Sequence, residues 1–181
     1  MIADDVRRQL LAIARDHLEA RVHGHAAPSI PRGLALASSG VFVTLYCRDE
    51  LRGCLGSLDA ADSVADAIAR LAAAVCREDR RFEPLQAGEL PASALELSVL
   101  TPPERIVDPA AVEVGRHGLI AERGGRKGLL LPQVAPEHGW DRETFLAHTC
   151  IKAGLNGDAW KRDAILYVFE AEVFGERYGH K

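Results

Sequence analysis

A guanidinium, a thiol and two glycines occur within residues 51–56 (LRGCLG). If this segment is extended, the side chains of Arg52 and Cys54 point to the same face. A guanidinium beside the thiol would favour the thiolate, the reactive form of cysteine, and the glycines would let a ligand approach the backbone. The pattern predicts an anion pocket in which Cys54 reacts while Arg52, Gly53 and Gly56 bind substrate. The open alternative is a small cysteine buried in a glycine-rich strand.

Further polar groups are candidates to serve such a site. His117 stands between glycines before a predicted strand and is a candidate general base, because imidazole titrates near neutral pH. Glu96 is a second candidate for proton transfer. Asp79 and Arg81 follow a predicted helix and would form a polar wall that binds substrate. The alternatives are that His117 is a turn residue and that the charged segment is a solvated helix end.

Several common site types are missing from the sequence. There is no Walker motif, no Gly-x-Gly-x-x-Gly after a strand and no Gly-x-Ser-x-Gly, which argues against the usual nucleotide-binding and α/β-hydrolase classes. The four cysteines form no Cys-x-x-Cys pair. His23 and His25 lie in a loop without nearby carboxylates or thiols, which makes a poor zinc site. The sequence therefore predicts neither a metal nor a cofactor.

Composition bounds the class of protein. The 181 residues suffice for one domain or two small lobes. The apolar content of 48% and the charged content of 27% are ordinary for a globular protein. The polar, acidic start is unlike a signal peptide, and no apolar run approaches the roughly 20 residues that span a bilayer. We therefore expect a cytoplasmic protein with reduced thiols and no membrane contact. The net charge of −4 argues against nucleic acid as a partner.

Hydrophobic periodicity predicts the elements that must position these groups. Helices are predicted over residues 4–21, 64–77 and 142–153. Strands are predicted over residues 41–47, 51–58, 95–100, 118–122, 128–131 and 165–174. Hairpins without a repeated strand-helix-strand rhythm indicate an α+β fold, with a largely antiparallel sheet and flanking helices.

Local signals refine this outline. Ser63 and Asp141 are predicted to cap helices, and Gly154 to end one in the left-handed conformation. In the strand over 95–100, Leu95, Leu97 and Val99 should face the core while Glu96 and Ser98 face away. The glycines at 53 and 56 predict a bulge or a close backbone approach in their strand.

A series of short segments then follows a fixed order along nearly the whole chain. The segments are 41–45 (VFVTL), 51–56 (LRGCLG), 79–82 (DRRF), 96–100 (ELSVL), 115–118 (GRHG), 128–135 (GLLLPQVA), 139–141 (GWD), 152–155 (KAGL) and 173–174 (VF). In this order the set resembles the AMMECR domain family, and most closely its prokaryotic branch, AmmeMemoRadiSam system protein A. Two positions depart from the family pattern: Leu55 stands where Ile is usual, and Arg80 where Pro is frequent, which loosens the backbone between Asp79 and Arg81.

The resemblance implies a single AMMECR-type domain over 1–181, subdivided into a larger and a smaller lobe with a cleft between them. It also implies partner proteins, because the branch is named for systems that include a Memo-family protein and a radical S-adenosylmethionine (SAM) protein. It supplies no reaction. It adds weight to Arg52, Gly53, Cys54 and Gly56 as a functional surface.

Two hypotheses from different classes follow. The first is an enzyme or enzyme component of unsettled activity, acting on a small molecule with those partners at a cleft around residues 52–54. The second is a non-catalytic binding or regulatory module for a protein partner or nucleic acid, which the net charge disfavours in its nucleic-acid form. The second is supported by scattered cations: Arg77, Arg80, Arg81, Arg123, Arg126 and Lys127.

Overall fold

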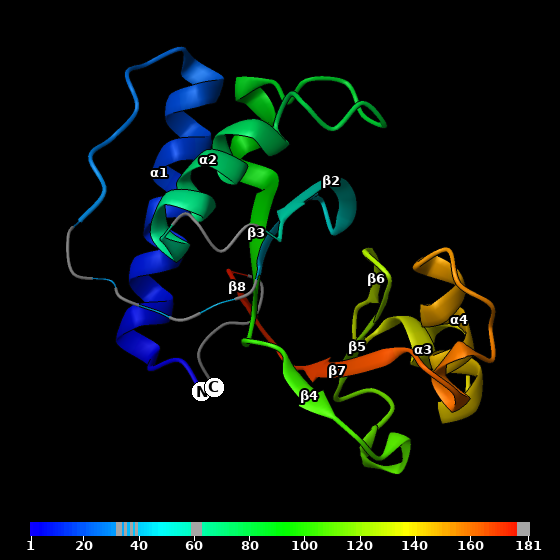
Figure 1. Cartoon of the computed structure of the whole chain (residues 1–181). Coiled ribbons are helices and arrows are strands. Elements are labelled where there is room, and N and C mark those ends of the chain that lie inside the picture. The colour runs from blue at the N-terminus through cyan, green and yellow to red at the C-terminus, as the bar shows by residue number, and fades with distance from the viewer. Residues whose placement is uncertain (32–33, 35, 37, 39, 59–62, 177–181) are drawn as a thin grey trace. The chain divides into compact units, whose positions relative to one another are not determined.

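The computed structural model describes residues 1–31, 34, 36, 38, 40–58 and 63–176. Within it the chain forms two compact units (Figure 1). The first unit comprises Met1–Leu100 and Glu172–Lys181, and the second comprises Thr101–Ala171. Each unit has its own sheet and its own hydrophobic core, so each is described by itself.

The first unit places two helices on one face of a sheet with strand order β2-β1-β3-β8. The helices are α1 (Asp4–His23) and α2 (Val64–Val75). The strands are β1 (Gly40–Cys47), β2 (Glu50–Ser57), β3 (Ser93–Leu100) and β8 (Ala171–Gly175), and the short 3-10 helix η1 (Ala87–Ala92) precedes β3. β1 pairs antiparallel with both β2 and β3. As predicted, Ser63 caps α2 by accepting the Asp66 N–H at 3.1 Å.

Strand alternation decides which face of this sheet meets the helices. Leu95, Leu97 and Val99 are 0–3% exposed and belong to the core that α1 and α2 cover. Glu96 and Ser98 are half-buried on the opposite face. The prediction for this strand is confirmed, because a period of two sends successive side chains to opposite faces.

The second unit has the strand order β4-β7-β5-β6, with every neighbouring pair antiparallel. Its strands are β4 (Glu104–Ile106), β5 (Gly118–Arg123), β6 (Arg126–Leu130) and β7 (Ile165–Phe169). Its helices are α3 (Val134–Glu137) and α4 (Arg142–Lys152), with 3-10 helices η2 (Pro109–Ala111) and η3 (Ala159–Lys161). α4 packs on β5 and β6.

Both predicted ends of α4 are confirmed. Asp141 accepts the N–H of Thr144 at 2.8 Å, which satisfies one of the free N–H groups of the first turn. At the other end Gly154 has a φ of 71°, and the N–H of Leu155 returns to the carbonyl of Cys150 at 2.9 Å. This return bond is the one expected when a left-handed residue ends a helix.

The α+β class with antiparallel pairing is confirmed, and the strands are distributed over two sheets. The strand predicted over 165–174 is divided between them: β7 lies in the second unit, and β8 pairs within the first. The division falls at Glu170, whose backbone N–H donates to Oγ1 of Thr101 and whose carbonyl accepts the Thr101 N–H, both at 2.9 Å. β4 and α3 escaped prediction because elements this short show no period.

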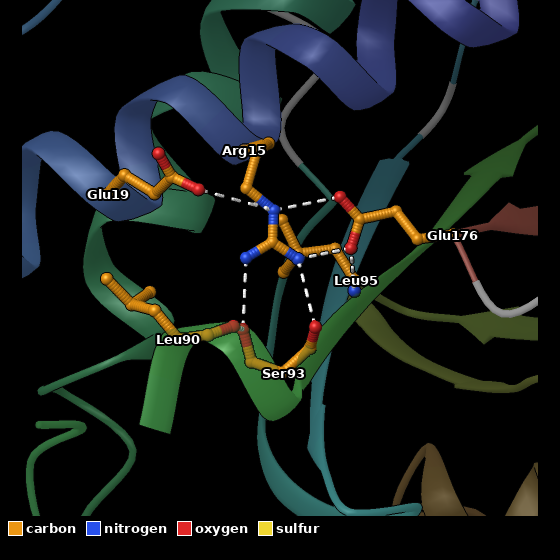
Figure 2. Close-up of polar contacts among 6 residues, drawn as sticks. All are labelled: Arg15, Glu19, Leu90, Ser93, Leu95 and Glu176. Atoms are coloured by element: carbon orange, nitrogen blue, oxygen red, sulfur yellow. Dashed lines mark hydrogen bonds and ion pairs between the residues drawn. The ribbon is translucent and has the colours of Figure 1, made fainter. Parts of the chain in front are cut away.

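The C-terminal end of the described chain is tied to α1 by a polar network around Arg15 (Figure 2). The Arg15 guanidinium pairs with both carboxylate oxygens of Glu176 and donates to Oγ of Ser93 at 3.0 Å. Glu176 in turn accepts the N–H of Leu95 at 2.7 Å, and its own N–H donates to the Leu95 carbonyl at 3.0 Å. One arginine therefore joins α1, the start of β3 and the segment that follows β8.

We expect Arg15→Met to lower the free energy of unfolding by about 1–3 kcal/mol, because it removes several charge-assisted hydrogen bonds from a mostly buried side chain and leaves Glu176 without its cation. Urea denaturation followed by circular dichroism would measure this loss. The matched control is Arg8→Met, an exposed arginine on the same helix. This control should change stability by less than about 0.5 kcal/mol. Equal midpoints for the two variants would show that the network does not stabilise the fold.

Candidate functional site

β2 carries the predicted reactive segment, and it contains a bulge. Leu45 pairs with Gly53 while the next residue, Tyr46, pairs with Leu51, so Arg52 is the extra residue of β2. The bulge confirms the irregularity predicted from the glycines. It also interrupts the strict alternation on which a common face for Arg52 and Cys54 was predicted.

The guanidinium of Arg52 is engaged by the segment that follows α2. Its Nε donates to the carboxylate of Glu89 at 3.1 Å, and its Nη1 donates to the carbonyl of Glu83 at 2.6 Å. The pKa of Glu89 is lowered by the backbone N–H of Gln86 and by Arg52. The role of Arg52 as a substrate anchor remains a prediction, and a substrate anion would compete there with the Glu89 carboxylate.

The two glycines beside Cys54 are approached closely by the protein's own chain. A Cβ on Gly53 would lie 2.9 Å from the carbonyl oxygen of Val75, at the end of α2. A Cβ on Gly56 would lie 2.2 Å from the ring of Phe42. These positions therefore need glycine for packing alone, and their predicted contact with substrate stays a prediction.

Strand pairing brings Cys54, Thr44 and Glu96 into one row across β2, β1 and β3. Thr44 is the direct partner of Cys54 on one side and of Glu96 on the other. Direct partners share a face, and this face is opposite the helices. The hydroxyl of Thr44 donates to Sγ of Cys54 at 3.5 Å, and the hydroxyl of Tyr46 donates to the Glu96 carboxylate at 3.5 Å. We call Cys54, Thr44 and Glu96 the thiol row.

Cys54 is a half-buried residue, which distinguishes it from the two buried cysteines, Cys76 and Cys150. Cys76 is 3% exposed and Cys150 is 0% exposed, whereas Cys54 and Cys47 are half-buried. Burial raises the pKa of both Cys76 and Cys150, because an apolar surrounding disfavours the thiolate. Cys54 as a residue is thus not fully buried, and its reactivity stays a prediction.

Asp79 and Arg81 hold the backbone of the thiol row at its outer edge. Because β2 is an edge strand, the N–H of Cys54 points away from β1, and Oδ2 of Asp79 accepts it at 2.9 Å. Arg81 binds the same carboxylate through Nε at 2.9 Å and Nη2 at 2.6 Å. The Arg81 guanidinium, together with the Cys54 N–H, holds the pKa of the 7% exposed Asp79 well below its usual range, despite burial.

Arg81 is also the cation bound to the carboxylate that accepts the Cys54 N–H. Its pKa is raised chiefly by its hydrogen bond to the Asp79 carboxylate. The side chain of Arg81 is 60% exposed, so it faces solvent.

His117 belongs to the second unit and is held by its own turn. Its Nδ1 accepts the N–H of Glu113 at 3.1 Å, and its backbone N–H donates to the Glu113 carbonyl at 2.9 Å. These bonds fit the turn-residue alternative, and its role as a general base stays a prediction. Thr44 and Tyr46 were missed as site residues. The only signal for these two residues in the sequence was a polar side chain alternating with apolar ones. That alternation does not indicate which residues of other strands lie beside them.

Two further observations concern the class of site. Among the residues that the structure describes, no three His, Cys, Asp or Glu side chains gather closely enough to hold a metal ion. Within the same ranges, no helix combines the length and the apolar character needed to cross a membrane.

Comparison with known proteins gives a consistent result. The model of the AMMECR1 family matches residues 11–174. A protein of Methanosarcina acetivorans is 39% identical, with 98% of this chain and 94% of that protein covered. Protein MK0488 of Methanopyrus kandleri is 47% identical over 76% of this chain and 71% of its own length. The crystal structure of uncharacterized protein PH0010 from Pyrococcus horikoshii superposes with a TM-score of 0.79 at 39% identity, covering 98% of this chain and 94% of that one.

Proposed function

The chain belongs to the AMMECR1 family, and we propose that it is an enzyme or enzyme component in which the thiol of Cys54 attacks or contacts a small-molecule substrate. The observation that carries the proposal is the thiol row. A partly exposed thiol, a hydroxyl that donates to it and a carboxylate occupy three adjacent positions on a face opposite the helices.

Each member of the row has a chemical role in this proposal. Cys54, as the thiolate, would add to a doubly bonded electrophilic carbon of the substrate, and the π electrons of that double bond would move onto the substrate as the C–S bond forms. The Thr44 hydroxyl would stabilise the negative charge on sulfur before this step. Glu96 would take up or return the substrate proton, since it lies on the same face one strand further along. Arg81 would attract the anionic part of the substrate from the solvent side.

The arrangement of Asp79 supports this assignment. The buried Asp79 carboxylate accepts the Cys54 N–H and so fixes the backbone at the nucleophile. The same carboxylate orients the Arg81 guanidinium. Reactive groups gain from such positioning, because small displacements of a catalytic atom cost large factors in rate.

We further propose that the protein acts in the cytoplasm with a Memo-family protein and a radical SAM protein, as its family resemblance implies. Affinity purification of this protein from its own cells, followed by mass spectrometry, would test the association. Recovery of neither partner in reducing, low-salt buffer would contradict a stable complex.

The proposed thiol chemistry predicts that Cys54 is alkylated fastest among the four cysteines. Cys76 and Cys150 should react slowly, because burial disfavours their thiolates. Cys47 is an internal control, since it is also half-buried but lies outside the thiol row. Iodoacetamide labelling of the native protein, with mass spectrometry reporting each site, would measure the four rates.

The same labelling tests the role of the nearby cation. We expect Arg81→Gln to slow labelling of Cys54 by about threefold to tenfold, because a cation beside a thiol favours the thiolate. Arg80→Gln is the matched control, an adjacent exposed arginine that should leave the rate unchanged. If Cys54 reacts no faster than Cys47, the row is better explained as a binding surface for a ligand or a partner.

Metabolite profiling would connect the thiol to a reaction. A deletion strain carrying Cys54→Ala should keep the metabolite changes of the deletion, and a strain carrying Cys47→Ala should reverse them. Full reversal by Cys54→Ala would exclude covalent catalysis at this thiol.

A further inference from the structure

The hairpin between β5 and β6 holds two arginines directly opposite each other. Arg123 and Arg126 are cross-strand partners that close a turn made of Gly124 and Gly125. Both glycines have positive φ values, 57° and 78°. Such values suit a two-residue hairpin turn. The geometry of the turn therefore fixes two guanidinium side chains on one face of the hairpin.

Only part of this positive charge is matched within the described residues. Arg123 pairs with the carboxylate of Asp163 at 2.7 Å. Arg126 donates from Nη1 to the carbonyl of Gly154 at 2.9 Å, and that group carries no net charge. Like charges directly opposite on a sheet are unfavourable, so the described surroundings leave this pair with an excess of one positive charge.

A hollow of about 340 Å³ opens beside the two arginines. Arg123, Gly124, Arg126 and Leu155 line it. A Cβ added to Gly124 would meet no atom within 4 Å, so the backbone of the turn is open to a ligand at this point. The hollow thus combines two guanidinium groups, an accessible backbone and one apolar side chain.

We propose that this hollow, which we call the hairpin hollow, binds a small anion, either phosphate or the carboxylate of a small molecule, with Leu155 contacting an apolar portion. A guanidinium presents parallel N–H donors that match the oxygens of carboxylate and phosphate. Each arginine has N–H groups beyond the one that its described partner uses. The proposal concerns the second unit alone and does not depend on the chemistry of Cys54.

A simpler account explains only one of these features. Arg126 binds a carbonyl just after the C-terminal end of α4, where cations are favoured by the helix dipole. Arg123 is held by Asp163, but neither contact accounts for two arginines lining the same hollow. An anion bound in the hollow would relieve the repulsion between the two side chains.

The test is a titration of the whole protein followed by nuclear magnetic resonance of the backbone amides and the arginine Nε–H groups. The arms are sodium phosphate, sodium acetate and sodium chloride at equal ionic strength. Phosphate or acetate should give saturable shifts at Arg123, Gly124, Gly125 and Arg126, and the tighter arm identifies the anion. Chloride should give only small, unsaturated shifts.

Variants distinguish specific anion binding in the hairpin hollow from a nonspecific effect of added ions. Arg126→Gln should weaken binding by about tenfold or more, which corresponds to about 1.4 kcal/mol, while Arg126→Lys should lose less because it keeps the charge. The matched control is Arg105→Gln, an exposed arginine on β4 at the other edge of the same sheet, which should bind as the wild type does. Unsaturated shifts in all arms, or equal weakening by Arg105→Gln, would overturn the proposal.

Discussion

Replacing Gly128 with alanine is expected to destabilise the second unit by about 3 kcal/mol or more, because an overpacked site with a backbone neighbour cannot relax by a side-chain rotation. A Cβ at this position would lie 2.3 Å from the backbone N of Ala153 and 2.5 Å from the carbonyl C of Lys152. β6 therefore packs directly on the last turn of α4. Any shift that relieves the clash must move a strand or a helix end.

Denaturant unfolding monitored by tryptophan fluorescence would measure this effect, since Trp140 and Trp160 both lie in the second unit. The matched control is Gly157→Ala in the same unit, where the nearest atom to a new Cβ is Cδ1 of Ile151 at 3.5 Å. That contact is ordinary, so the control should change stability by less than about 0.5 kcal/mol. Similar midpoints for the two variants would mean that β6 and α4 are not packed as described.

Asp79→Ala is expected to lower the free energy of unfolding by about 2–3 kcal/mol and to slow alkylation of Cys54. The substitution leaves the Cys54 N–H without its acceptor at the edge of the sheet and removes the carboxylate that orients Arg81. Most of the loss should come from the hydrogen bonds of the buried carboxylate. The ion pair adds little, because the Arg81 side chain is 60% exposed. Water screens such a pair.

The same carboxylate predicts a pH dependence of stability. The pKa of Asp79 is lowered in the folded protein, so its contribution is complete above the unfolded pKa of about 4 and is lost as the pH falls below that value toward the folded pKa. The difference in unfolding free energy between wild type and Asp79→Ala should therefore begin to shrink at about pH 4 and continue to shrink as the pH falls further. Asp16→Ala, an exposed carboxylate on α1, is the control and should show no such trend. A difference that stays constant with pH would contradict the hydrogen bonds that the structure gives to the Asp79 carboxylate.

The candidate site shows where prediction from sequence stopped. Cys54 and Glu96 were both singled out, and the structure places them on one sheet face with Thr44 between them. Arg52 is two residues from Cys54 along the chain, yet it binds Glu89, whereas Arg81 binds the Asp79 carboxylate that accepts the Cys54 N–H. The bulge at position 52 changes the direction of the Arg52 side chain. The six residues 51–56 alone do not indicate which residue that side chain will bind.

The sequence by itself determined the features that depend on neighbours along the chain. The cap at Asp141, the helix end at Gly154 and the two-sided strand around Glu96 were all predicted, because capping and alternation involve residues a few positions apart. The order of short segments likewise predicted the family, which the match over residues 11–174 confirmed.

Only the tertiary structure decided which distant segments meet. Residues 165–174 read as one strand, but β7 and β8 belong to different sheets, and hydrophobic alternation is the same whichever sheet a strand joins. The partners of Cys54 come from β1 and from the loop after α2, at positions that no local pattern specifies. Pairing between strands and the closure of long loops depend on the whole chain, so the site's geometry, unlike its residue types, exists only once the sheet has formed.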